Sequence, residues 1–228
     1  MNKILPYLKV FLLAILAGLS IGLGGFLYLL ITWGLPNELG KALGSAAFSV
    51  GLFLVCTFGL WLYTGKIGNV FEGKQKASFY ISLPICLIGN AVGAIGLGYL
   101  CFAIFRETGL FAVAQGAANS RLALNSFYDY LSFCLRSTLC GFCVYMAVKL
   151  FAKNRLKPLG ISMLVFFVFL FVYCGFQHCI ANMFYLAFGN SYGNGMAYVS
   201  LLLAIAFNSF GPILGIAVFK IIETKKAE

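Results

Sequence analysis

The chain has 228 residues, of which 62% are hydrophobic and 10% charged, and its formal net charge is +10. A soluble domain averages about 45–50% apolar and about 25% charged residues, so this composition excludes a disordered chain, a collagen-like chain and an ordinary soluble enzyme. The excess of Lys and Arg is expected beside anionic lipid rather than on nucleic acid. A spanning helix needs roughly 20 apolar residues. We therefore expect five to seven spans in one transmembrane domain, residues 1–228, with no soluble appendage.

Six stretches are long and apolar enough to cross a bilayer. In chain order they are 10–32, 43–64, 77–105, 127–148, 159–186 and 196–219. The first is too long for a cleaved signal peptide. The fourth contains Asp129 and Arg136 and the fifth contains His178, whereas the other four are uncharged. The longest outer connection is the loop 106–126.

Lys and Arg flank these stretches unequally. One side would carry twelve of them: Lys3, Lys9, Lys66, Lys74, Lys76, Lys149, Lys153, Arg155, Lys157, Lys220, Lys225 and Lys226. The other side would carry three: Lys41, Arg106 and Arg121. Because Lys and Arg accumulate in cytoplasmic loops, we predict a multi-pass protein of the cell (inner) membrane with both termini in the cytoplasm. An even number of spans agrees with this distribution.

The two halves of the chain resemble each other. The third and sixth stretches both contain Asn-x-x-Gly, at Asn90–Gly93 and Asn208–Gly211. The second and fifth stretches each contain a suspected helix break, at 59–65 and 175–182, and the distance from Thr64 to Asn90 (26 residues) is close to that from His178 to Asn208 (30 residues).

Three spans per half would insert the halves in opposite directions. The pattern predicts an inverted 3+3 repeat, with halves of about 1–110 and 111–228, broken helices 2 and 5, and a binding site near the midplane. Non-helical backbone at that depth must line a cavity or be buried in protein. The alternative is that these Gly and Asn residues only allow helices to pack closely.

Four strings resemble the formate/nitrite transporter family, which includes formate, nitrite and hydrosulfide channels. They are Phe48–Leu52 continuing through Leu62–Gly65, Gly89–Ala94, Gly175–Phe184 and Asn208–Gly211. The third is similar to the family's long signature Gly-Phe-Glu-His-Ser-x-Ala-Asn-Met. The resemblance covers nearly the whole chain. It implies an all-α, aquaporin-like fold of six transmembrane helices and a homopentamer, with neither cofactor nor metal. Each protomer would hold a pore for a small monovalent anion, with a central His between two apolar constrictions.

His178 is the only histidine in the chain. Ionisable groups inside a membrane span are expensive and usually functional, and the reference pKa of histidine, near 6.5, allows proton exchange near neutrality. Moving a carboxylate-sized ion into a medium of dielectric about 4 costs of order 20 kcal/mol in the Born limit. We therefore predict that His178, or water that it orders, gives a proton to the anion. Positive ends of the half-helices after the two breaks would attract the anion.

The resemblance also implies roles for other residues. Phe48, Leu52 and Tyr63 would form or flank the inner constriction, and Phe171 and Cys140 the outer one. Four further positions would line the substrate path near the His: Thr64, Ser137, Gln177 and Arg121. Asn90 and Asn208, which carry the paired motifs, are also expected along the substrate path. Arg121 aligns with a basic residue at the outer edge of the fourth span, and Ser137 falls where the family usually has Asn.

Several positions depart from the family pattern. Gln177 stands where the signature has Glu, so a role for that acid in tuning the His loses support. Trp61 replaces an acidic or polar residue, and Lys66 follows the break where the family tends to be polar. Asp129 and Arg136 are seven residues apart on one helical face. An ion pair between them at a protomer interface is the first interpretation, and a pore charge from Arg136 is the second.

Two other classes of function remain open. Cys140 and Cys143 form a C-x-x-C, which in a soluble protein would suggest a thiol oxidoreductase, but here it lies in an apolar stretch. One His without acidic partners does not complete a metal site. The second class is a channel for water or a neutral solute, which would not need His178. The sequence does not choose among formate, nitrite, hydrosulfide, acetate and lactate, or between a channel and a proton-coupled transporter.

Overall fold

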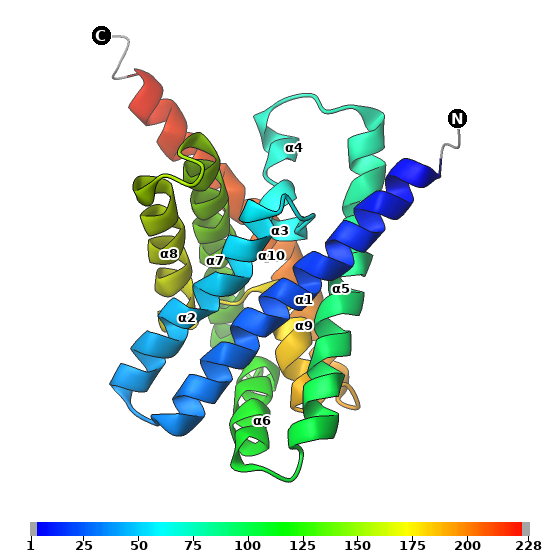
Figure 1. Cartoon of the computed structure of the whole chain (residues 1–228), viewed down its shortest axis with the longest axis vertical. Coiled ribbons are helices and arrows are strands. Elements are labelled where there is room, and N and C mark those ends of the chain that lie inside the picture. The colour runs from blue at the N-terminus through cyan, green and yellow to red at the C-terminus, as the bar shows by residue number, and fades with distance from the viewer. Residues whose placement is uncertain (1–3, 225–228) are drawn as a thin grey trace.

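The computed structural model describes residues 4–224, which form ten helices and no strand (Figure 1). The helices are α1 (Leu5–Gly34), α2 (Glu38–Thr57), α3 (Tyr63–Lys66), α4 (Asn69–Glu72), α5 (Ala77–Phe105), α6 (Gly109–Leu122), α7 (Phe127–Lys153), α8 (Pro158–Tyr173), α9 (Cys179–Phe188) and α10 (Gly195–Thr224). The predicted all-helical class is confirmed. Lys3, Lys225 and Lys226 lie outside the described residues.

Five of these helices are long and apolar enough to cross a membrane: α1, α2, α5, α7 and α10. The predicted stretch 43–64 corresponds to α2, but this helix ends at Thr57. The predicted stretch 159–186 is divided into α8, of 16 residues, and α9, of 10 residues. The helices therefore stop where glycine-containing segments interrupt the apolar sequence, at residues 58–62 and 174–178.

The expected outer loop 106–126 instead contains α6, a helix of 14 residues. Its buried residues are Leu110, Ala114 and Ala118, which are four residues apart and so lie on one face. This face packs against α9. Arg121 lies in the last turn of α6 and not at the edge of the fourth span, as the resemblance had suggested.

Asp129 caps the first turn of α7. Its Oδ2 accepts hydrogen bonds from the N–H groups of Asn125 and Ser126, at 3.1 and 2.8 Å, and from the hydroxyl of Ser126 at 2.9 Å. The N–H of Asp129 donates to the Ser126 hydroxyl at 3.3 Å, which completes a capping box. The expected ion pair with Arg136 is therefore wrong: among the side chains that the structure describes Asp129 forms no ion pair, and its carboxylate caps α7 instead.

Two helix pairs approach closely through glycine. α1 packs along α5, and α7 packs along α10. A Cβ on Gly18 would overlap the carbonyl oxygen of Asn90, and a Cβ on Gly141 would overlap that of Asn208. These contacts bring α1 against the Asn-x-x-Gly motif of α5 and α7 against that of α10.

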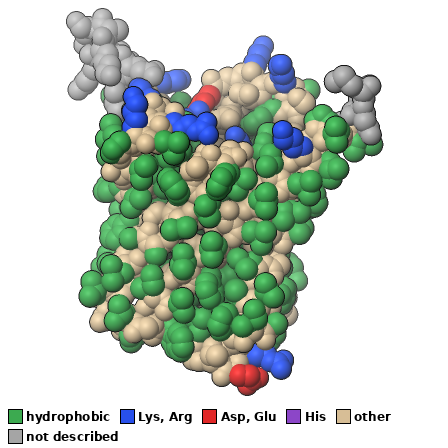
Figure 2. Space-filling view, in the orientation of Figure 1, with side chains coloured by type: hydrophobic (Ala, Val, Ile, Leu, Met, Phe, Trp, Pro, Cys, Tyr) green, Lys and Arg blue, Asp and Glu red, His purple; other side chains and the backbone are tan. Residues whose placement is uncertain are grey.

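The most buried helix is α9, in which all ten residues are buried. It lies among α1, α5, α6 and α10 (Figure 1). The outer surface carries many exposed Leu, Ile, Val and Phe side chains. Figure 2 shows this apolar belt between two charged ends, with most of the visible Lys and Arg at the end where α1 begins and α10 finishes. The fold thus places a buried helix inside an apolar shell.

Candidate functional site

The two interruptions have the same backbone conformation. Gly59 and Gly175 adopt left-handed φ angles of +65° and +67°. In both, the next residue donates its N–H to a carbonyl five residues earlier, Leu60 to Val55 at 2.9 Å and Phe176 to Phe171 at 2.8 Å. This is the hydrogen bonding of a helix that ends on a glycine. The glycines terminate α2 and α8 and turn the chain toward the molecular centre.

Substitution of either glycine by alanine tests this turn. No atom lies within 4 Å of the position that a Cβ would take at Gly59 or Gly175, so the cost is conformational rather than steric. A left-handed conformation costs a residue with a Cβ about 1–2 kcal/mol. We expect Gly59→Ala and Gly175→Ala each to lower the stability of the detergent-purified protein by that amount in thermal unfolding. Gly96→Ala, at an open helical position on α5, should be neutral or stabilising; equal losses in all three variants would contradict the assignment.

Asn90 and Asn208 brace the two interruptions in the same way. The Asn90 amide donates to the carbonyls of Ala14 and Trp61, at 2.8 and 2.7 Å, and its Oδ1 accepts from the N–H of Tyr63 at 2.8 Å. The Asn208 amide donates to the carbonyls of Ser137 and Gln177, at 2.7 and 2.8 Å, and its Oδ1 accepts from the N–H of Cys179 at 2.8 Å. Each Asn thus satisfies two backbone groups at an interruption and ties them to a carbonyl of a neighbouring regular helix, α1 or α7.

These hydrogen bonds indicate that the two asparagines have a structural role. Both side chains are fully buried and line neither of the pockets described below. We expected them along the substrate path. Their hydrogen bonds instead hold Tyr63 and Cys179 at the starts of α3 and α9, and so fix the residues that follow each interruption.

His178 lies at the second interruption and caps α9. Its Nδ1 accepts a hydrogen bond from the N–H of Ala181 at 3.2 Å. A nitrogen that accepts from an N–H carries a lone pair, so in the neutral ring the proton is on Nε2. Nε2 is 3.0 Å from the hydroxyl oxygen of Thr64, and it therefore donates to that oxygen. Both side chains are buried. The two interruptions meet at this hydrogen bond.

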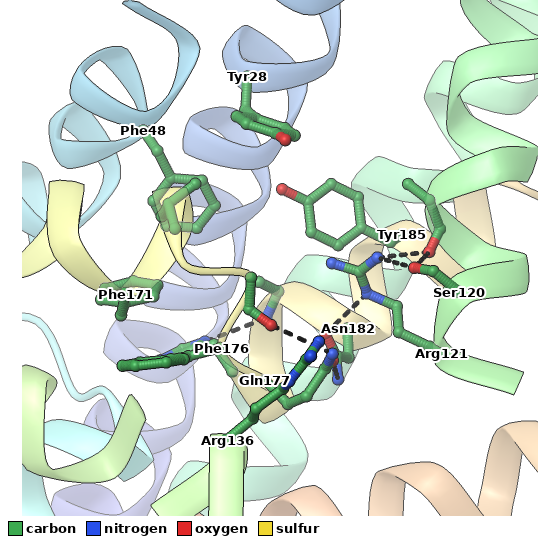
Figure 3. Close-up of a pocket in the computed structure, with 15 residues that line it drawn as sticks. Tyr28, Phe48, Ser120, Arg121, Arg136, Phe171, Phe176, Gln177, Asn182 and Tyr185 are labelled. Carbon is green, nitrogen blue, oxygen red and sulfur yellow. Dashed lines mark hydrogen bonds between the residues drawn. The ribbon is translucent and has the colours of Figure 1, made fainter. Parts of the chain in front are cut away.

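A cavity of about 250 Å³ adjoins His178 on one side. We call it the Arg121 pocket. Its lining includes Tyr28, Phe48, Arg121, Arg136, Phe171, Gln177, His178, Asn182 and Tyr185 (Figure 3). Nε of Arg121 donates to Oδ1 of Asn182 at 2.9 Å, and Nδ2 of Asn182 donates to Oε1 of Gln177 at 3.0 Å. The Arg121 guanidinium lies 4.2 Å from the centre of the Tyr185 ring. These contacts fix a positive charge in the pocket.

A second cavity, of about 270 Å³, lies on the other side of the interruptions. We call it the Lys66 pocket. Its lining includes Cys56, Leu60, Leu62, Lys66, Phe151 and Arg155. The Arg155 guanidinium donates to the carbonyl of Thr57 at 3.2 Å, and the Lys66 ammonium lies 5.3 Å from the centre of the Trp61 ring. No Asp or Glu among residues 4–221, whose side chains the structure describes, lines either pocket. Both cavities are therefore positively charged.

Aromatic rings close the Arg121 pocket. The rings of Phe48 and Phe171 meet edge to face at 5.7 Å, and Phe171 stacks on the His178 ring at 5.9 Å. Phe48 was expected on the inner constriction with Leu52 and Tyr63, but it lies with Phe171. Leu52 is one helical turn further along α2 and almost fully buried, and Val55, in the next turn, already lines the Lys66 pocket. Leu52 therefore lies between the levels of the two cavities.

Three predicted path residues point elsewhere. The Tyr63 hydroxyl is 3.0 Å from Oγ of Ser209 on α10, and Tyr63 lines neither pocket. The Ser137 hydroxyl donates to the carbonyl of Phe133, in its own helix, at 2.8 Å, rather than to His178. Cys140 is buried inside α7 and lines neither pocket; all eight cysteines are free thiols.

Sequence reasoning did not select several residues that belong to this site. Asn182 connects Arg121 to Gln177, and Tyr185 lies under the Arg121 guanidinium. Both are on α9, one and two turns after His178. Leu62 lines the Lys66 pocket and occupies the position before Tyr63 that His178 occupies before Cys179. The spacing from His178 could have identified Asn182; the partners of Arg121 depend on tertiary packing.

Comparison with known proteins agrees with these features. The sequence profile of the family described as Formate/nitrite transporter matches residues 2–222. The chain is 32% identical to the uncharacterized transporter YrhG of Bacillus subtilis, covering 96% of this chain and 85% of that one. It is 28% identical to a probable formate transporter of Methanothermobacter thermautotrophicus, covering 94% and 86%. A solved pentameric formate channel with formate bound superposes with a TM-score of 0.76 at 25% identity, over 99% of both chains.

Proposed function

The chain belongs to the formate/nitrite transporter family, and we propose that it conducts a small monovalent anion, with formate as the first candidate, through a pore within each chain. Because the members of this family are transporters, the chain is a transport protein and not an enzyme. One observation carries the proposal: the only histidine lines one of two positively charged cavities and is bonded to Thr64, whose chain neighbour Gly65 lines the other. The related channel with formate bound supports the choice of anion.

The pore that we propose is an inverted repeat of six spans. α2 with α3, and α8 with α9, would each form one interrupted span. The first half, about 1–110, would contain α1, α2–α3 and α5, and the second, about 111–228, would contain α7, α8–α9 and α10. The matching hydrogen bonds of Asn90 and Asn208, and the matching glycine turns, support this division. Broken helices at a midplane site are common in such repeats.

Anions would collect in the two cavities. Fixed positive charges lined by low-dielectric walls concentrate counter-ions, and each cavity contains two cationic side chains. The N-terminal end of α9 adds a partial positive charge beside His178. α3 has only four residues, so the expected contribution from a half-helix at Thr64 is small.

The proton step would take place at His178. A bare anion cannot easily pass the apolar contact of Phe48 and Phe171 with His178. An anion in the Arg121 pocket favours the imidazolium form of the ring by Coulomb attraction. A proton from the bulk solution, relayed by pocket water, would bind His178 and pass to the anion, and the neutral acid would cross and release the proton on the far side. Protonation at Nδ1 removes the acceptor of the Ala181 N–H, which favours return to the neutral ring.

Uptake into proteoliposomes tests the transport function itself. Vesicles containing the protein should take up formate, nitrite or hydrosulfide faster than protein-free vesicles. Swelling in glycerol, measured by light scattering, should be the same with and without protein. Glycerol permeation without uptake of any of the three anions would overturn the proposal and would indicate a neutral-solute pore.

Thr64→Val provides a test of the central hydrogen bond. The substitution keeps the shape of the side chain but leaves Nε2–H of His178 without its acceptor. An unsatisfied buried donor costs about 1–3 kcal/mol, and we expect saturating formate uptake to fall about tenfold, which corresponds to about 1.4 kcal/mol. Thr138→Val is the matched control, because its hydroxyl bonds only to its own helix and lines neither pocket. Equal rates for the two variants would contradict the role of Thr64.

Assembly and location complete the proposal. We propose a homopentamer in the cell membrane with both termini in the cytoplasm. The exposed apolar belt needs lipid or neighbouring copies to cover it, and the end rich in Lys and Arg suits the cytoplasmic side (Figure 2). Native mass measurement in detergent should give five copies per particle, and a protease that removes a C-terminal tag should act only on inverted vesicles.

A further inference from the structure

Arg136 is a second cationic side chain of the Arg121 pocket. It is contributed by α7, whereas Arg121 comes from α6. Figure 3 shows the Arg136 side chain extending from α7 toward Gln177 and Asn182. Its guanidinium has no hydrogen-bond or ion-pair partner among the residues that the structure describes. Five donors of a permanently charged group therefore remain available at the pocket.

The acidic group nearest in sequence does not neutralise this charge. Asp129 shares an adjoining cavity with Arg136, but its carboxylate is used in capping α7 and forms no ion pair with the guanidinium. Gln177 lies between the arginines as a neutral amide, and its Oε1 already accepts from Asn182. The lining of the Arg121 pocket thus combines two guanidinium groups with no carboxylate in the described chain.

Arg121 is positioned to share an anion with Arg136. Its Nε donates to Asn182, and its Nη1 donates to the Ala117 carbonyl and the Ser120 hydroxyl. Nη2 has no partner within residues 4–224. One arginine is therefore held rigidly against Tyr185 with a donor left over, and the other is unrestrained. Guanidinium groups match anions that present two oxygens in a plane.

We propose that Arg121 and Arg136 together form a capture site for a planar two-oxygen anion, a carboxylate or nitrite, at the entrance from the Arg121 pocket. The site rests on the proposed transport function. It adds to that function a role for Arg136, which would set the apparent affinity for the anion on the side of the membrane to which the Arg121 pocket opens. The anion supplies the negative charge that the pocket lacks. It then passes from the arginines to His178, which lines the same cavity.

Arg136→Gln tests the capture site. Formate uptake would be measured from the side to which the Arg121 pocket opens, using right-side-out membrane vesicles, across a range of ionic strength. The Debye length is about 30 Å at 0.01 M and about 3 Å at 1 M ionic strength. The apparent KM should rise about 3- to 10-fold at 0.01 M, in line with the low end of charge-steering effects. The difference should fall below about twofold at 1 M, with the saturating rate unchanged.

Three matched variants separate charge from structure. Arg136→Lys keeps the charge but loses the planar fork, so its apparent KM at 0.01 M should lie between those of the unmodified protein and Arg136→Gln. Gln177→Glu places a carboxylate beside the arginines and should raise the apparent KM as Arg136→Gln does. Arg106→Gln removes an exposed arginine that is paired with Glu107 and does not line the pocket, so it should have no effect.

The outcomes distinguish this site from the transport function. If the unmodified protein transports formate but Arg136→Gln has the same apparent KM at low ionic strength, the capture site is overturned and the transport function stands. An equal loss in Arg136→Lys and Arg136→Gln would also overturn it, because charge would not be the cause. If the unmodified protein moves no anion, the transport function itself fails. An unchanged saturating rate in Arg136→Gln shows that the variant is folded.

Discussion

Replacement of His178 by asparagine is expected to abolish the acceleration of formate uptake by an inward proton gradient. Asparagine is a strong helix N-cap, so it can still accept from the Ala181 N–H and keep the start of α9. Its side chain is shorter than the imidazole, so the hydrogen bond to Thr64 is lost, as it is in Thr64→Val. It cannot carry a proton. An imposed gradient should therefore stimulate uptake by less than about twofold in this variant, while the unmodified protein shows a stimulation of about tenfold or more, equivalent to about 1.4 kcal/mol.

Comparison with His178→Ala distinguishes the loss of proton transfer from the loss of the α9 N-cap. Alanine loses both hydrogen bonds, so this variant should lose the proton response and about 0.5–2 kcal/mol of stability. His178→Asn should lose the proton response but keep the cap, and Thr64→Val is the control for its lost hydrogen bond to Thr64. Both would be measured by radiolabelled formate uptake into proteoliposomes and by thermal unfolding of the purified protein. Full gradient stimulation in His178→Asn would show that the ring does not carry the proton.

Asn90→Leu and Asn208→Leu should be the most destabilising substitutions in the protein. Each removes three hydrogen bonds, two of which satisfy a carbonyl and an N–H at an interruption of regular helix in the protein interior. An unsatisfied buried polar group costs about 1–3 kcal/mol. Each variant should thus lose at least about 2 kcal/mol, visible as a lower unfolding temperature in detergent and a reduced yield of assembled protein.

Asn154→Leu is the matched control for this prediction. Its amide makes one long hydrogen bond, of 3.4 Å, to the carbonyl of Leu150 at the end of α7. A change of this kind is usually within about 0.5 kcal/mol. The two interruptions are equivalent in geometry, so Asn90→Leu and Asn208→Leu should cost similar amounts. Stability equal to that of Asn154→Leu in either one would contradict the bracing role.

Most of the fold could be predicted from local sequence signals. Long apolar runs predicted the helices, because a chain of this composition has few other ways to satisfy its backbone in lipid. Gly59 and Gly175 indicated the interruptions because glycine enters the left-handed region at little cost. The family resemblance, carried by the string around His178, is confirmed by the profile match over residues 2–222.

The errors came from a local hydrogen bond that competes with an ion pair and from contacts between distant segments. Asp129 and Arg136 share a helical face, and their spacing alone favoured an ion pair. In the structure the Asp129 carboxylate instead accepts hydrogen bonds from Ser126 in the capping box of α7. Phe48 was placed by alignment with the inner constriction, but the distance between the Phe48 and Phe171 rings depends on how α2 packs on α8. Asn90 and Asn208 attracted notice as a repeated motif, while their hydrogen-bond partners lie up to 76 residues away in sequence.

The central claim is that the substrate crosses the middle of the pore as a neutral acid. In proteoliposomes, a membrane potential can be imposed with potassium and valinomycin at equal pH on both sides, or a pH gradient can be imposed at zero potential. Formate uptake should follow the pH gradient and change by less than about twofold with a potential of 100 mV, although one net charge would gain about 2.3 kcal/mol from it. Uptake that follows the potential and ignores the pH gradient would show that the bare anion crosses, and would contradict the account.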